Sequence, residues 1–132
     1  MKPSPQQAEA QGARIHGVDC RPVRELIAKI GAKWSMMIIT RLSHGPMRFN
    51  ALRRDIGGIS QKVLTQSLRE LERDGFVTRT VTPVIPPRVD YALTDLGRDL
   101  LVPVNALGAW AVANQARVAA ARAAYEQKVP VV

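Results

Sequence analysis

The sequence predicts a mainly α-helical fold with one small β-hairpin (α+β). Two observations predict it. From Cys20 onward most apolar residues recur at helical spacing, whereas residues 76–94 are rich in Val and Thr and alternate at both ends. A chain of 132 residues suggests one domain with a modest core. We expect this domain to span 18–126, between a flexible N-terminal tail (1–17), rich in Pro, Gln, Ala and Gly, and a C-terminal tail (127–132).

Three helices are expected between residues 20 and 56. Pro22 suits the first turn of the first helix. A second runs from about Lys33 to Ser43, where "HGP" stops it, and a third, short helix starts at about Arg48. Their apolar sides comprise Leu26, Ile27 and Ile30 in the first, Trp34, Met37, Ile38 and Leu42 in the second, and Phe49, Leu52 and Ile56 in the third.

A fourth helix is expected between Ser60, a good N-cap residue, and Gly75, a good C-terminal stop. Leu64, Leu68 and Leu71 form one apolar stripe along it. The opposite face carries no acid, and its members are Lys62, Thr65, Gln66, Arg69 and Arg73. Such groups bind phosphates and contact base edges in a major groove, although an ordinary surface helix with a chance excess of cations would look similar.

A β-hairpin follows, with "FVTRTV" and "RVDYAL" as strands and the proline-rich "TPVIPP" as the loop between them. A short helix, a glycine turn, a longer basic helix and then a hairpin make a winged helix-turn-helix. Thr94 is expected to cap a final helix, which Pro103 should kink or break. The apolar side chains of that helix are Leu96, Leu100, Leu101, Val104, Leu107 and Trp110.

The bulk charge favours a polyanionic partner. Lys and Arg number 19 against 11 Asp and Glu, giving a net charge of +8. Nucleic acid is the first candidate for such a basic chain, and an anionic membrane surface is the second. No apolar run is long enough to span a membrane, and the N-terminus lacks the apolar centre of a signal peptide. We therefore expect a cytoplasmic protein.

Several motifs, in order and at fitting spacing between residues 20 and 110, resemble the HxlR-type family of bacterial winged helix-turn-helix transcriptional regulators. They are "CRPV", "IGAKW", "GPMRFNALRRDIGGIS", "KVLTQSLRELERDG", "PPRVDYALTDLG" and a distal "AL…W". The sequence departs from the family pattern at Ala32, where a second glycine is usual, and at Arg21. Neither departure affects the expected fold.

The resemblance implies additional N- and C-terminal dimerisation helices and a homodimer that binds a two-fold symmetric operator. The composition agrees, because the C-terminal helix has more apolar surface than a small core can cover. Packing of its Ala-rich part back on its own chain is the alternative. The residues expected at the dimer interface are Leu26, Ile27, Leu100, Val104, Leu107 and Trp110.

The expected DNA contacts follow from the helix-turn-helix geometry. The N-terminal end of the fourth helix should approach the bases, the preceding helix should cross the backbone, and the hairpin should add a basic contact. Base contacts are expected from Gln61, Lys62, Thr65 and Gln66, whereas Arg69, further along the same helix, should reach phosphate or stay solvated. Backbone and hairpin contacts are expected from Arg48, Arg53, Arg54, Arg79 and Arg88. For each residue, a side chain that only faces water is the alternative.

Cys20 is the one cysteine, so no intrachain disulfide can form. Some members of the family sense oxidants, quinones or aldehydes through a cysteine at this position. Arg21 and the start of a helix favour an ionised thiol here, Asp19 opposes it, and a thiol without a role is the alternative. His16 lies four residues before Cys20, but two ligands do not make a zinc site. We expect no metal and no cofactor; a small-molecule effector in the dimer interface stays open.

Two other classes of function compete with a DNA-binding regulator. A winged-helix module that binds protein or RNA, without operator specificity, should present an apolar or acid-rich face on the helix at 60–74, which this sequence does not. An enzyme should present a nucleophile elbow, a phosphate loop or paired carboxylates, and none is evident. The sequence therefore predicts a regulator that is not an enzyme.

Overall fold

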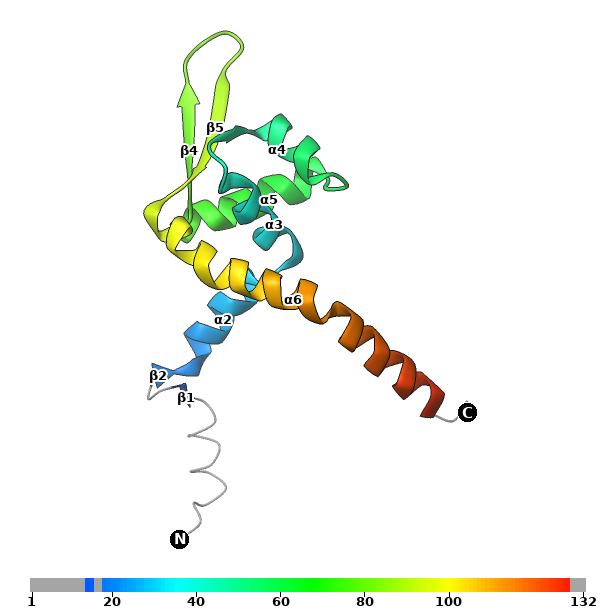
Figure 1. The fold of residues 1–132 in the computed structure, drawn as a ribbon. Helices are drawn as coiled ribbons and strands as arrows, with labels where there is room; N and C mark the ends of the chain where they lie inside the picture. Colours follow the sequence, from blue (N-terminus) through cyan, green and yellow to red (C-terminus); the bar gives the residue numbers. More distant parts are fainter. Residues whose placement is uncertain (1–13, 16–17, 129–132) are drawn as a thin grey trace.

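The computed structural model describes residues 14–15 and 18–128, and Figure 1 shows a helical body from which a two-stranded wing and one long helix project. The predicted mainly α-helical fold with a small hairpin is confirmed. In chain order the elements are β1 (Arg14–Ile15), β2 (Val18–Asp19), α2 (Cys20–Ile30), α3 (Lys33–Leu42), β3 (Met47–Arg48), α4 (Phe49–Ile56), α5 (Gln61–Arg73), β4 (Val77–Thr82), β5 (Arg88–Leu93) and α6 (Asp95–Lys128).

The ends of the described chain differ from the expected boundaries. Strand β1 pairs antiparallel with β2, although Arg14–Ile15 falls in the range where the sequence predicts a flexible tail. At the other end, α6 continues to Lys128, two residues into the expected C-terminal tail. The rest of the two expected tails, with His16, lies outside the described residues.

The core lies around α3, which contacts α4, α5, α6 and β5. Its fully buried side chains come from α3, α4, α5 and the root of the wing, and they are Ile38, Ile39, Leu52, Leu64, Leu68 and Val77. The predicted stripe of Leu64, Leu68 and Leu71 on α5 is buried throughout. Burial of that stripe leaves the opposite face of α5 outside the body.

The sheet has three antiparallel strands in the order β3–β5–β4, one more than the sequence predicts. Strand β3 pairs with β5 through Met47 opposite Tyr91 and Arg48 opposite Asp90. Two residues are too few to show the alternation that marks a strand. Arg48, expected to start a helix, is instead the end of β3 and the N-cap of α4.

Both ends of α5 form as the sequence predicts. The Ser60 hydroxyl accepts a hydrogen bond from the Val63 amide at 3.1 Å, which satisfies one free N–H of the first turn. At the other end Gly75 has φ +84° and Phe76 N–H donates to the Leu71 carbonyl at 2.9 Å. This left-handed glycine with a bond back to the last turn is a Schellman motif. Local chemistry therefore sets the length of α5.

Helix α6 begins as predicted, since the Thr94 hydroxyl accepts a hydrogen bond from the Gly97 amide at 3.0 Å. The break expected at Pro103 is wrong: α6 is continuous over 34 residues. Proline removes one helical hydrogen bond, but Leu100, Leu101 and Val104 hold the surrounding turns against the body. Over 105–128 every residue except Gly108 and Asn114 is exposed, and this half projects from the body (Figure 1).

Candidate DNA interface

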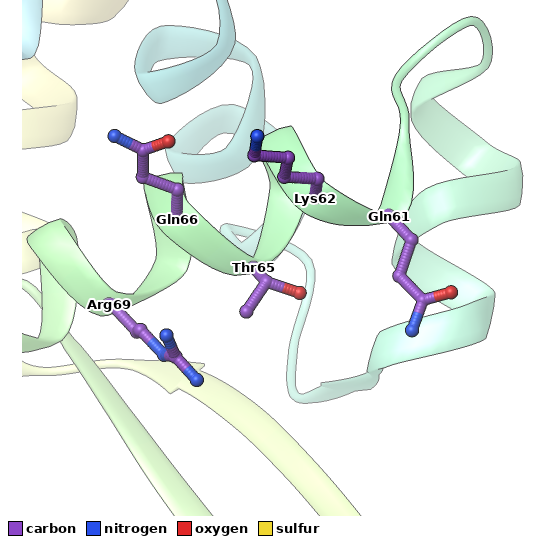
Figure 2. A pocket seen from close by; sticks show the side chains of 5 residues that line it. All are labelled: Gln61, Lys62, Thr65, Gln66 and Arg69. Atoms are coloured by element: carbon purple, nitrogen blue, oxygen red, sulfur yellow. The ribbon is translucent and has the colours of Figure 1, made fainter.

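The outer face of α5 brings together the five side chains predicted for DNA contact on this helix. Gln61, Lys62, Thr65, Gln66 and Arg69 line one open hollow of about 550 Å³, which we call the helix hollow. Four of them are exposed, and Thr65 is half-buried. Figure 2 shows Gln61 at the N-terminal end of the helix and Arg69 two turns later, on the side of the wing strands. The face is polar and cationic, with no acid among its lining residues.

The wing meets α5 in a second hollow of about 310 Å³, lined by Thr65, Arg69, Glu72, Arg79 and Tyr91. Arg79, whose strand face the sequence leaves open, therefore lies on the side of the wing toward α5. Glu72 and Tyr91 were not predicted here. They come from the flank of α5 and from β5, and only the docking of the wing on α5 brings them to this place. The Glu72 carboxylate offsets part of the charge of the two arginines.

A third hollow of about 440 Å³, the arginine hollow, lies between the wing and the start of α4. Its cations are Arg48 from β3, Arg54 from α4 and Arg88 from β5, and Pro86 and Pro87 of the wing loop also line it. The pairing of β3 with β5 brings these residues together. Arg88 also donates from Nε to Asp90 Oδ2 at 2.9 Å.

The first turn of α4 adds to the positive character of the arginine hollow. Phe49, Asn50 and Ala51 line it, no side chain caps the helix, and the first turn holds no acid. Free amide groups at a helix N-terminus favour an anion, and guanidinium groups bind phosphate oxygens in a forked geometry. The arrangement can therefore hold a phosphate group.

Arg53 differs from its neighbour Arg54. Its Nε donates a hydrogen bond to the Ile59 carbonyl at 3.1 Å, across the turn that joins α4 to α5. Together with Asn50, Arg54 and the turn itself, Arg53 lines a further open hollow of about 500 Å³. Asn50 thus borders both this hollow and the arginine hollow. It was not predicted, although its position one turn before Arg54 on the same helix could have indicated it.

The residues expected at a dimer interface fall into two groups. Leu26, Ile27, Leu107 and Trp110 are 42%, 58%, 54% and 58% exposed. Leu100 and Val104 instead pack within their own chain, Leu100 against the core and Val104 at 6% exposure. The first part of α6 thus packs on its own body, whereas the part from Leu107 onward, which includes the Ala-rich stretch, leaves its apolar side chains uncovered and does not pack back on the chain.

Cys20 is a free cysteine and is buried, with 6% exposure, at the first residue of α2.

Within 14–15 and 18–128, no three His, Cys, Asp or Glu residues gather as a metal site would need. No helix in the described part is long and apolar enough to cross a membrane.

A short α4, a glycine turn and α5 with a polar, cationic outer face, followed by a basic hairpin, define a winged helix-turn-helix protein. The chain belongs to the HxlR-like helix-turn-helix family, whose model matches residues 29–119. The family predicted from the sequence motifs is thereby confirmed.

Known relatives support this assignment. The chain is 45% identical over 101 residues to the uncharacterized HTH-type transcriptional regulator YtfH of Escherichia coli K12, over 76% of this chain and 80% of that protein. A solved structure of the putative regulator ytfH from Salmonella typhimurium is 44% identical with a TM-score of 0.71, over 76% of this chain and 90% of the other. The redox regulator HypR in its oxidized form is 41% identical with a TM-score of 0.65, over 70% and 96%. The chain is a helix-turn-helix regulator by family.

Proposed function

We propose that this protein regulates transcription as a homodimer that binds a two-fold symmetric DNA operator. One observation carries the proposal: the helix hollow presents Gln61, Lys62, Thr65, Gln66 and Arg69 on one outward face of α5. Glutamine and lysine at the start of such a helix are groups that form hydrogen bonds with base edges in the major groove. The family supports DNA binding, and a regulator of this kind acts in the cytoplasm, where the operator DNA is.

The other cationic residues contact the DNA backbone in this proposal. Arg48, Arg54 and Arg88 bind phosphate in the arginine hollow, while Arg79 lies beside Arg69 where the wing meets α5. Arg53 is close enough to Arg54 to add charge, but its Nε is engaged by the Ile59 carbonyl. These contacts give affinity and orientation, and the α5 face gives sequence preference.

A second copy of the chain covers the exposed apolar side chains Leu26, Ile27, Leu107 and Trp110 in the proposed dimer. Pairing of two helix-turn-helix units sets two α5 helices on half-sites about 34 Å apart, one turn of DNA. Leu107→Glu should therefore yield a monomer in sedimentation equilibrium and bind the full site weakly. Val112→Glu places the same charge at another exposed apolar residue of α6. A dimeric Val112→Glu protein would exclude Val112 from the interface, and a monomeric one would include it, so the two variants together map the extent of the interface.

We further propose that Cys20 receives a signal, because HypR, a relative of similar structure, is a redox regulator. Cys20 is buried, so an oxidant or electrophile reaches the sulfur only after residues around it move. Modification at the start of α2 then adds bulk to a closed site and shifts α2, which alters the spacing of the two α5 helices. With one cysteine per chain, a disulfide links two subunits or a subunit and a small thiol.

Selection of genomic DNA fragments tests these proposals. The purified protein is mixed with fragments at about 150 mM salt, and the retained DNA is sequenced, with and without a mild thiol oxidant. Enrichment of a two-fold symmetric site is the expected result. Loss of that enrichment with oxidant, and its persistence in a Cys20→Ser variant, is expected if Cys20 is the sensor.

Retention of bulk DNA with no enriched sequence would contradict the regulator proposal and favour a general interaction module. If wild type and Cys20→Ser respond equally to the oxidant, the sensing role of Cys20 would be contradicted, while the regulator proposal would stand.

A further inference from the structure

The tip of the wing is apolar, in contrast to its base. From Thr80 to Pro87 the chain carries no charged side chain. Ile85 is 102% exposed and Val84 is 49% exposed. A single exposed aliphatic residue needs no explanation, but here two adjacent ones occupy the most projecting loop of the molecule (Figure 1).

The tip is held in shape. The Val84 amide donates to the Thr82 carbonyl at 2.9 Å, and prolines at 83, 86 and 87 restrict the backbone on both sides of Ile85. A restricted loop loses little conformational entropy when it binds. The aliphatic side chains are therefore presented in advance, as a binding element should be.

The surroundings of the tip favour a nucleic-acid partner. Pro86 and Pro87 line the arginine hollow together with Arg48, Arg54 and Arg88. An apolar tip directly beyond a group of cations matches a DNA groove, which has phosphates at its rim and bases and sugars inside. A phosphate held in the arginine hollow would place the groove next to Val84 and Ile85.

The length of the wing is compatible with the minor groove. With α5 in the major groove, the adjacent minor groove lies about half a helical turn away, roughly 17 Å. Strand β4 alone, from Val77 to Thr82, spans about 17 Å at 3.3 Å per residue, and the loop extends further. Apolar side chains such as Ile are those that wedge between base steps from the minor groove.

We propose that Val84 and Ile85 enter the minor groove beside each half-site and that Ile85 determines specificity there through the ease with which a base step unstacks. This inference rests on the proposed function. Flexible pyrimidine–purine steps unstack at lowest cost, so the wing selects them without hydrogen bonds to bases.

The test uses the full-length protein and the site enriched by wild type. Ile85→Ala should bind that site about ten-fold more weakly, because contact area is lost, while the slope of affinity against salt stays the same. Replacement of the pyrimidine–purine step should weaken wild type and leave Ile85→Ala nearly unaffected. Val81→Ala removes a half-exposed aliphatic side chain from the stem of the wing and should bind like wild type.

A direct readout comes from 2-aminopurine placed at that step, whose fluorescence rises on unstacking. Wild type should raise the signal and Ile85→Ala should not. An Ile85→Ala protein with wild-type affinity and fluorescence would overturn the inference while leaving the regulator proposal intact. A change of oligomeric state in Ile85→Ala would show instead that the tip contacts a second copy. A wild-type protein that enriches no site would contradict both the regulator proposal and the inference about Ile85.

Discussion

The guanidinium of Arg53 donates a hydrogen bond from Nε to the carbonyl oxygen of Ile59 at 3.1 Å. The bond spans the glycine turn between α4 and α5, in which Gly57 and Gly58 have φ +71° and +70°. Ile59 itself is buried. The bond therefore joins the end of α4 to the entry of α5 and contributes to the angle between them, which in the proposed function sets how α5 meets DNA.

Replacement of Arg53 should lower stability as well as DNA affinity. We expect Arg53→Ala and Arg53→Lys each to reduce the free energy of unfolding by about 1 kcal/mol, since neither has a donor at the Nε position. Urea denaturation measures the change. Arg54→Ala is the control: it should leave stability within about 0.5 kcal/mol of wild type and weaken DNA binding. Full stability of Arg53→Lys would show that the charge matters and the hydrogen bond does not.

Arg88 and Asp90 should act on DNA affinity in opposite directions. Arg88→Ala should weaken binding to all sequences alike and flatten the slope of log affinity against log salt by about one unit. The ion pair is partly exposed, so stability should change by less than about 1 kcal/mol. Asp90→Asn removes the negative charge beside the Arg88 guanidinium and should tighten binding. An unchanged salt slope in Arg88→Ala would place this side chain away from phosphate.

Gln66 should contribute to sequence preference rather than to overall affinity. If its amide bonds one base, as glutamine does with adenine, Gln66→Ala loses about 1–3 kcal/mol of discrimination at that position. Binding to a panel of operators with single base changes measures this loss. Gln115→Ala, an exposed glutamine on α6, should leave the whole preference profile as in wild type. A profile that is the same in Gln66→Ala and wild type would refute the base contact.

Gly97 should be the least replaceable glycine of α6. A Cβ at this position would collide with the carbonyl oxygen of Phe76 and press on Leu93 Cδ2 at 3.1 Å. We expect Gly97→Ala to lose about 3 kcal/mol of stability, because backbone rather than a flexible side chain blocks the space. At Gly108 nothing lies within 4 Å of an added Cβ, so Gly108→Ala should gain about 0.5–1 kcal/mol. Thermal unfolding of both variants compares them; equal stabilities would mean that α6 shifts freely away from Phe76.

Helix α5 shows how far the sequence alone reaches. Its caps at Ser60 and Gly75, its buried stripe through Leu68 and its outer face were all predictable. Each depends on interactions within about four residues along the chain, where periodicity and capping chemistry act. The two long strands of the wing and the Thr94 cap were also predictable, the strands from their alternating pattern and the cap from its residue type.

Contacts between distant segments were not predictable in this way. The arginine hollow exists because β3 pairs with β5, yet a two-residue strand leaves no pattern to detect. The Arg53 hydrogen bond depends on the path of the turn. The position of Arg79 on the face of the wing toward α5 depends on how the wing docks against α5. Pro103 stays within a continuous α6 because the body holds the turns around it.

The sequence by itself thus determined the class of protein, the extent of helix α5 and the identity of its outward side chains, since these follow from short-range propensity and amphipathic spacing. Tertiary structure alone decided which cations share one hollow, which apolar residues of α6 are buried in the chain and which, like Trp110, stay exposed. The physical reason is that burial and charge clustering depend on where separate elements pack, and packing is a property of the whole chain.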